Sequence, residues 1–550
     1  MRKEFLLGIC ALVGVGTIQK VHAQNKRPNV LFILTDDENI NTLGCYGNNV
    51  TTPNIDKLAK NGIRFTNANV VHTVCSPSRY SIITGRYYDN NYHPKFLKNF
   101  PSDKPSCVGN TIMLENDGMN LAGVLKQNGY NTGFVGKFHL GRHEVLGTNR
   151  NWKANGLKTY GRDEDPRVNS EMNQKLKSNH KWWCNAIKEF GFDYVNGVYS
   201  ANMREFFNKN MNAHNVEWTA DASIKFIEQQ KDKADPFFLF VGTTYPHGPA
   251  PEKKVNGKYI ASLDADPSIT GEGIVLDGKE EKIAARQKIK NSIKKDQDKK
   301  SATAQWWDAS VGAIIAKLKE TGQYENTLII YTSDHGKRNG SKTTLYEGGV
   351  HVPLIVHWAN NIKSERIYNN IVGSIDITPT ILDVCDANIP SKMKMDGISF
   401  KSVIEGQEKA TREALLLRMG YACGVKTNNW KYIALRYPVA DEKAIQQGKT
   451  FIGHRKETIS QPYYMLHKQL SQKAAKNNKH YFERNQLFEY KKDKRENKNL
   501  YLENKMVAAK MHSIMAKELQ KVNSKRSYGE FVGTDKAAFN HLKFVINYPE

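Results

Sequence analysis

The sequence predicts a large α/β domain, in which helices flank a doubly wound mixed sheet, followed by a smaller α+β domain with an antiparallel sheet. Three continuous apolar runs support the large sheet, at residues 30–34, 237–241 and 328–331. Runs of this length are typical of strands buried on both faces. Helical patterns lie between them, and alternating strands and helices indicate α/β architecture. We place the two domains at residues 24–395 and 396–550.

Each apolar run is followed by polar, ionisable residues. The first ends in Asp36-Asp37, the second precedes Tyr245-Pro246-His247, and the third precedes Asp334-His335. Ligands of open α/β sheets bind beyond the carboxyl ends of the strands. We therefore expect these acids and histidines to form one site.

Helices are predicted at residues 55–61, 121–127 and 306–319, each with a glycine near its end. In the second domain, residues 414–418 and 430–435 flank a turn-like segment at 426–429, which predicts an antiparallel hairpin. A last helix is expected at 506–522.

Two long segments, 141–178 and 257–300, are polar, poorly periodic and typical of insertions. The lysines at 288–300 are expected to form a solvated surface. Three aromatic pairs could stack on sugar rings, but such pairs are more often part of a core: Tyr87-Tyr88, Trp182-Trp183 and Trp306-Trp307.

The N-terminus resembles a targeting segment. Met1-Arg2-Lys3 is positively charged, residues 5–18 are largely apolar, and Val21-His22-Ala23 resembles a cleavage site. We expect residues 1–23 to be a signal peptide and the mature protein to be exported, periplasmic or secreted. No later run is long enough to span a bilayer, so no membrane span is predicted.

The chain is strongly basic, with 80 Lys and Arg against 56 Asp and Glu and a net charge of +24. Such a surface attracts polyanions. Export argues against nucleic acid, and a sulfated or uronate-rich polysaccharide suits that compartment better. A basic surface of no specific use is the alternative on charge alone. The seven cysteines show no spacing typical of a zinc site or a dense disulfide framework, and the oligomeric state is left open.

One segment carries the most specific signal. Cys75-Ser76-Pro77-Ser78-Arg79, followed by Thr84-Gly85-Arg86, resembles the sulfatase signature C-x-P-x-R and T-G-R. In that family a maturation enzyme oxidises the cysteine to formylglycine. Taken alone, the five residues also fit a buried structural cysteine beside a turn-forming proline.

Further blocks match the same family in the family's own order. They lie at residues 27–37, 52–59, 62–65, 136–141, 246–249, 333–336, 346–350, 376–380 and 396–397. The chain is therefore identified as a member of the formylglycine-dependent sulfatases, with the resemblance implying an alkaline-phosphatase-like fold and a bacterial glycan sulfatase. Two positions depart from the family pattern: Phe138 stands for the commoner Trp, and His351 stands for the usual Arg.

The resemblance implies a metal site made by Asp36, Asp37, Cys75 as formylglycine, Asp334 and His335. Several carboxylates select a hard divalent cation, so Ca²⁺ is the first choice and Mg²⁺ the second. His335 is the least usual member of this set, because an imidazole nitrogen is not a typical calcium ligand. Outside this setting, Asp36-Asp37 would indicate only a helix N-cap after a strand.

The resemblance also implies a mechanism. Formylglycine at position 75 is hydrated, and one hydroxyl of the hydrate attacks sulfur. Arg79 and Lys137 hold the hydrate and neutralise developing charge. His139 removes a proton from the other hydroxyl, which releases sulfate and restores the aldehyde. His247 and Lys342 bind sulfate oxygens and protonate the leaving alcohol.

The expected function is thus sulfate ester hydrolysis on a sulfated glycan. A phosphonate or phosphate ester hydrolase of the same superfamily is the first alternative, because the fold and the nucleophile motif do not fully separate them. A non-catalytic protein that binds acidic polysaccharide is the second. Specificity is expected from residues 142–215 and 253–300 and from the small domain.

Overall fold

The computed structural model describes residues 27–100, 112–142, 145, 151–248, 254–255, 258–259, 262–292, 299–436 and 468–522. The predicted signal peptide, residues 1–23, lies outside the described residues. Within the described part of the chain, no helix has both the length and the apolar character that crossing a lipid bilayer requires.

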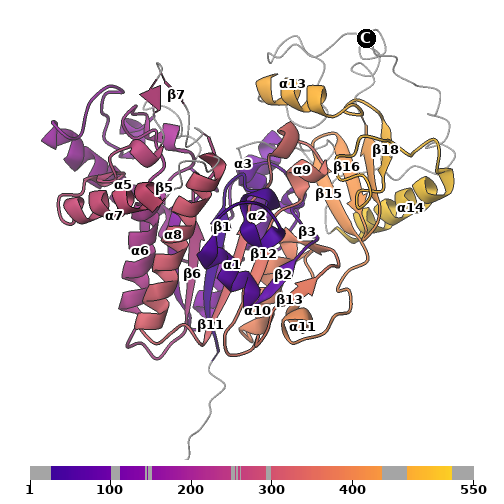
Figure 1. The fold of residues 1–550 in the computed structure, drawn as a ribbon, viewed down its shortest axis with the longest axis horizontal. Helices are drawn as coiled ribbons and strands as arrows, with labels where there is room; N and C mark the ends of the chain where they lie inside the picture. Colours follow the sequence, from indigo (N-terminus) through magenta and orange to yellow (C-terminus); the bar gives the residue numbers. More distant parts are fainter. Residues whose placement is uncertain are drawn as a thin grey trace, which may run out of the picture.

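The large sheet has eight strands in the order β13-β2-β12-β11-β1-β6-β4-β5 (Figure 1). The strands are β1 (Asn29–Thr35), β2 (Ile63–Phe65), β4 (Asn131–Lys137), β5 (Tyr194–Tyr199), β6 (Phe237–Gly242), β11 (Thr327–Ser333), β12 (Leu354–His357) and β13 (Arg366–Tyr368). β12 is antiparallel to both of its neighbours, and all other pairs are parallel. The predicted mixed α/β sheet is confirmed.

The three apolar runs of the sequence form the centre of this sheet, where β1 lies between β11 and β6. Phe32 of β1 pairs with Ile330 on one side and with Phe240 on the other. Because these strands are parallel and in register, their carboxyl ends reach the same edge of the sheet. That edge holds the predicted site.

Alternate residues of β1 pack against different helices on the two faces of the sheet. Leu31 and Ile33 share one core with α1 (Pro53–Lys60), α6 (Val216–Gln229) and α8 (Lys299–Glu320). Val30, Phe32 and Leu34 share the other core with residues of the helices on the opposite face, α2 (Cys75–Thr84), α4 (Leu121–Gln127), α5 (Ser170–Lys188) and α10 (Ile377–Val384).

The aromatic pairs belong mainly to the core, as the more common interpretation predicted. Trp306 and Trp307 are fully buried under the sheet, and Tyr87 and Tyr88 are buried as well. Trp183 is buried and Trp182 is partly buried against the same core.

The remaining elements are short or peripheral. They are β3 (Ala68–Asn69), α3 (Pro94–Asn99), β7 (Lys254–Val255), β8 (Lys258–Tyr259), β9 (Ile269–Thr270), β10 (Gly273–Ile274), α7 (Lys279–Ser292), α9 (Glu347–Val350), α11 (Lys401–Ile404), β14 (Val372–Gly373) and α13 (Lys468–Asn477). Part of the polar, poorly periodic segment 257–300 forms the helix α7. Its apolar residues are few, but its lysines, glutamates and alanines favour a helix.

The C-terminal part contains a four-stranded antiparallel sheet, β15 (Leu415–Met419), β16 (Ala422–Lys426), β17 (Lys431–Leu435) and β18 (Asn485–Phe488), and the helix α14 (Lys505–Lys521). The predicted hairpin between 414–418 and 430–435 was wrong, because β16 lies between these strands. Small residues and Gly424 weaken the strand signal of β16.

This small sheet packs directly against the segment that follows β11. Leu345, Tyr346 and Val350 share one hydrophobic cluster with residues of β15 to β18. By contrast, Phe400 and Val403 belong to the core of the large sheet. The boundary at 395/396 stays a prediction.

Candidate metal and catalytic site

Two neighbouring strand ends bring the acidic residues together. Thr35 at the end of β1 pairs with Ser333 at the end of β11. Beyond this pair, the Asp334 N–H donates to the Thr35 carbonyl (3.0 Å), and the Asp37 N–H donates to Asp334 Oδ1 (3.1 Å). Asp37 has a positive φ of 68°. The chain thus turns sharply where its two acidic side chains enter the site.

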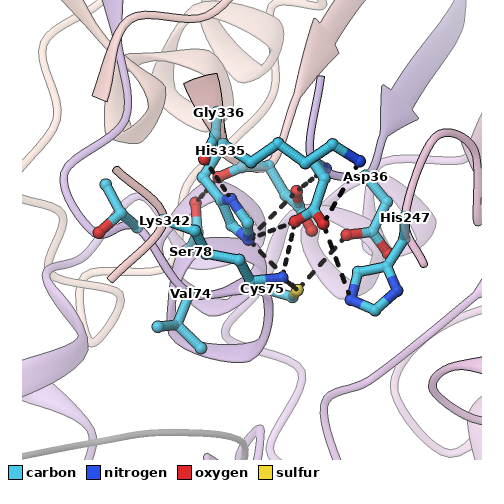
Figure 2. A network of polar contacts seen from close by, with 12 residues as sticks. Asp36, Val74, Cys75, Ser78, His247, His335, Gly336 and Lys342 are labelled. Atoms are coloured by element: carbon cyan, nitrogen blue, oxygen red, sulfur yellow. Dashed lines mark hydrogen bonds and ion pairs between the residues drawn. The ribbon is translucent and has the colours of Figure 1, made fainter. Parts of the chain in front are cut away.

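Cys75 is the first residue of α2 and lies within this acidic cluster (Figure 2). Its Sγ is 3.4 Å from Asp36 Oδ1, 3.3 Å from His335 Nε2 and 3.6 Å from Lys342 Nζ. Every residue of α2 is buried, so the helix fixes the position of Cys75.

The donor atoms of five residues lie within 4.8 Å of one another, and all five residues are buried: Asp36, Asp37, Cys75, Asp334 and His335. Three carboxylates in such a small space favour a hard divalent cation.

The hydrogen bonding of His335 also fits a cation. Its Nδ1 donates to the Gly336 carbonyl at 3.0 Å, since a carbonyl can only accept. The lone pair of a neutral ring then lies on Nε2, which is 3.3 Å from Asp37 Oδ1. A backbone carbonyl that orients a histidine in this way is common around metal sites. The cluster therefore suits a metal ion.

Two buried cations, Arg79 and Lys137, contact the carboxylates of the cluster. Arg79, one helical turn after Cys75, donates from Nε to Asp334 Oδ2 (2.9 Å) and from Nη1 to the Lys137 carbonyl (2.8 Å). Lys137, the last residue of β4, donates from Nζ to Asp36 and to Asn202 Oδ1, the latter at 2.8 Å.

Two further residues of the predicted set lie at the accessible side. Lys342 Nζ donates to Asp37 Oδ1 at 2.7 Å, and His247 Nε2 is 3.9 Å from Asp37 Oδ2. Their side chains are 12% and 18% exposed, whereas those of Arg79 and Lys137 are buried. His139 lies two residues after Lys137, is buried, and has a φ of 59°.

The surrounding cations control the charge of the acids. Burial alone would raise the pKa of Asp36, but Lys137, His247 and Arg79 hold it well below its usual range. Likewise, Lys342 and His247 overcome burial and lower the pKa of Asp37. Both carboxylates are therefore ionised at neutral pH.

At Cys75 and His247, unlike at the two acids, burial determines the direction of the pKa shift. Burial and the charge of Asp36 raise the pKa of Cys75 well above its usual range. Burial lowers the pKa of His247 to about 3 in spite of Asp37. At neutral pH, Cys75 thus carries a protonated thiol, which is a weak nucleophile.

Three residues at the site were missed by sequence reasoning. Asn202 binds the amine of Lys137, and Asn39 Oδ1 accepts from the N–H groups of Lys337 and Arg338 (both 2.8 Å). Lys337 Nζ donates to the Pro246 carbonyl (2.5 Å) and is 3.8 Å from Asp37 Oδ2. Lys337 follows the block at 333–336 directly and could have been found from that position. No motif marks Asn202.

The departure at His351 has a structural counterpart. Glu347 lies in the block at 346–350, just before the position where the family usually has arginine. It is paired with Lys426 (2.7 Å) and Lys431 (2.9 Å) from the small sheet. His351 Nδ1 is 3.6 Å from Glu347, and burial lowers the pKa of His351 to about 4. Two lysines therefore neutralise Glu347 where an arginine is absent. Phe138, the other departure, packs against Phe134 and Phe190.

Comparison with known proteins gives a consistent result. Residues 28–387 match the family described as Sulfatase, and residues 336–445 match the one described as N-sulphoglucosamine sulphohydrolase, C-terminal. The structure of the protein yidJ from Bacteroides fragilis is similar to this fold, with a TM-score of 0.59 and 22% identity, over 94% of this chain and all of that one.

Two curated relatives are similar in sequence. An ulvan-active sulfatase from Formosa agariphila is 26% identical over 413 residues, which cover 75% of this chain and 63% of that protein. An N-acetylglucosamine-6-O-sulfatase from Bacteroides thetaiotaomicron is 24% identical over 473 residues, covering 74% of this chain and 75% of that protein. The chain thus spans less than two thirds of the ulvan-active relative. The family match extends over more than half of the sequence, and the chain belongs to the sulfatase family.

Proposed function

We propose that this protein is a sulfuric ester hydrolase that removes sulfate from a sulfated glycan through a nucleophile made from Cys75. The observation that carries this proposal is the position of Cys75. Its Sγ lies within 3.6 Å of an aspartate, a histidine and a lysine, in a cluster that suits a divalent cation.

The high pKa of Cys75 explains why the residue has to be modified. A buried, protonated thiol attacks poorly. Oxidation to formylglycine by a maturation enzyme replaces it with an aldehyde, and the hydrate of that aldehyde offers two hydroxyls at the same place. One hydroxyl attacks sulfur, and loss of a proton from the other restores the aldehyde and releases sulfate.

Asp36, Asp37, Asp334 and His335 would hold the metal ion, together with position 75. Calcium is our first choice and magnesium the second. When bound, the cation supplies positive charge that acidifies the attacking hydroxyl and stabilises the reacting sulfate group.

The chain's own residues supply the rest. Arg79 and Lys137 are fixed by buried acceptors, so they meet developing negative charge without reorganisation. Lys342 stays cationic, because Asp37 raises its pKa against the effect of burial. Lys342 and His247 lie at the accessible side, where they bind the sulfate oxygens, and the cationic Lys342 protonates the leaving alcohol. We assign His139 as the base that removes the proton from the second hydroxyl.

Several observations support a sulfated glycan as substrate. The relatives include an ulvan-active sulfatase and an N-acetylglucosamine-6-O-sulfatase. The net charge of +24 favours a polyanion. The sequence of residues 1–23 resembles a signal peptide, so we propose a periplasmic or secreted enzyme that meets its substrate outside the cytoplasm.

The test compares initial rates on an aryl sulfate, an aryl phosphate and an aryl phosphonate with protein matured in a host that forms formylglycine. We expect the sulfate to be hydrolysed fastest, with Cys75→Ala inactive on all three. Cys385→Ala is the matched control, because Cys385 is a buried thiol outside the site. Faster hydrolysis of the phosphate or phosphonate would replace this proposal by an ester hydrolase of the other class.

A further inference from the structure

A cavity of about 400 Å³ lies on two segments of the predicted specificity region. Its lining consists of the following residues: Arg162, Arg204, Glu205, Phe207, Asn208, Lys209 and Asn212. Arg162 comes from the segment before α5, and the others come from the connection between β5 and α6. None of these residues belongs to the catalytic cluster.

Hydrogen bonds join the two segments into a fixed wall. Buried Asn208 donates from Nδ2 to the carbonyls of Gly161 (3.1 Å) and Glu164 (2.8 Å). The Lys209 N–H donates to the Arg162 carbonyl (3.0 Å). Each bond crosses from one segment to the other, so the cavity is formed before any ligand binds.

The same connection is attached at both ends to residues of the catalytic site. At its start, Asn202 Oδ1 accepts from Lys137 Nζ (2.8 Å). At its end, His214 Nε2 donates to the His247 carbonyl (2.8 Å). Two residues of extended chain span at most about 7 Å, so Arg204 lies close to Asn202. The wall of the cavity is therefore continuous with residues that contact Lys137 and His247.

The charges and the aromatic ring define the chemistry of the cavity. Arg204 is near Glu205 (3.4 Å), and Lys209 pairs with Asp163. For Arg162, no side-chain partner is present within the described part of the chain. Arginine binds carboxylates and sulfates through two parallel hydrogen bonds. Phe207 is only partly buried and offers an apolar surface beside these cations.

We propose that this cavity binds the carboxylate or the second sulfate of the sugar next to the one that carries the scissile sulfate. The inference rests on the proposed function and narrows the substrate to an acidic oligosaccharide. Arg162 and Arg204 bind the anion, and Phe207 packs against the sugar ring. The small aryl sulfate has no such group and does not use the cavity.

The experiment measures binding, so it does not depend on turnover. Calorimetry on Cys75→Ala with calcium present gives the dissociation constants of a panel of sulfated di- and tetrasaccharides with and without uronic acid. We expect at least one acidic member to bind, and its dissociation constant to rise about tenfold or more in an added Arg162→Ala/Arg204→Ala variant. The matched control is Lys57→Ala/Lys60→Ala, which removes two exposed cations from α1. Control binding should equal that of the parent.

Two further readouts separate the outcomes. Carboxyl-reduced and selectively desulfated forms of the bound oligosaccharide identify which anion the arginines recognise. In active protein, the double variant should leave kcat/KM on the aryl sulfate unchanged. Equal dissociation constants in the parent and the double variant, or no binding by any member of the panel, would overturn the inference. Failure of the aryl sulfate assay would instead overturn the proposed function.

Discussion

The segment 334–347 contributes residues to two buried clusters of charged side chains, one at each of its ends. The two clusters differ in their exposure to solvent and in how completely their charges are paired. The cluster around Asp36 and Asp37 combines acids, a thiol and a histidine, and its accessible side holds the partly exposed Lys342 and His247. The cluster around Glu347 contains Lys426 and Lys431, which are paired and fully buried. The first, which we call the open cluster, brings the donor atoms of five residues within 4.8 Å of one another and is partly exposed on one side. In the second, which we call the closed cluster, the carboxylates are already paired with lysines, which indicates a structural role.

Removal of metal is the strongest way to test this difference. Chelation should lower turnover of an aryl sulfate by about 10²-fold or more, because the site then lacks the cation whose positive charge stabilises the reacting sulfate group. Added Ca²⁺ should restore activity and raise the thermal midpoint, because it binds only the folded state. Activity that is unaffected by a chelator would remove the metal from this account.

In an Asp334→Asn variant, Ca²⁺ should no longer raise the thermal midpoint. A loss of the calcium effect in a Glu347→Gln variant instead would show that the two clusters had been assigned the wrong roles.

The closed cluster should respond in stability rather than in chemistry. Lys431→Met leaves Glu347 and Glu496 without their shared partner (2.9 and 2.5 Å). We expect unfolding to become easier by about 3–5 kcal/mol, the usual cost of breaking a buried ion pair. The measurement is thermal unfolding, with rates scaled to the folded fraction. Lys363→Met, which changes an exposed lysine, is the control. A loss of kcat in the folded fraction would contradict a purely structural role.

The closed cluster should contribute to the pH dependence of stability through His351. Burial lowers the pKa of His351 from 6.5 to about 4 in the folded state. Between these pH values the unfolded chain binds a proton that the folded protein does not, so stability falls as the pH drops from 6.5 to 4. The loss is at most about 3 kcal/mol. Unfolding midpoints of wild type and His351→Gln across this range test it, and an equal slope in both would exclude His351 as the source.

The smallest effect is expected at the rim of the open cluster. Lys337 is 43% exposed and meets Asp37 only at 3.8 Å. Exposed charges of this kind contribute about 0.2–1 kcal/mol. Lys337→Gln should therefore raise KM by about two- to fivefold with little change in kcat, and Lys337→Arg should restore it. A collapse of kcat would place Lys337 among the groups that touch the reacting atoms.

The sequence predicted the structure well where a single continuous segment determines a strand or a site residue. The apolar runs predicted β1, β6 and β11 because strands buried on both faces need continuous apolar residues. Parallel strands then brought Asp36 and Asp334 to one edge of the sheet. The family prediction is confirmed, and the structure places Cys75 within the acidic cluster, while its catalytic role stays a prediction.

The sequence was less informative where two distant segments meet. Lys426 and Lys431 resemble surface lysines in this lysine-rich chain, yet both are fully buried and paired with Glu347. Glu347 lies 79 and 84 residues earlier in the sequence, so no local pattern indicates these pairs. Asn202 likewise gained its role only through contact with Lys137. Strand β16 was missed because its small residues give a weak local pattern, whereas its pairing on both sides stabilises it.

The central claim is that position 75 carries an aldehyde in the active protein. Digestion of protein purified from its native host, followed by mass measurement of the peptide that contains position 75, tests this claim most directly. The account predicts a mass loss that matches conversion of the thiol to an aldehyde, with activity proportional to the converted fraction. An intact thiol in fully active protein would contradict it.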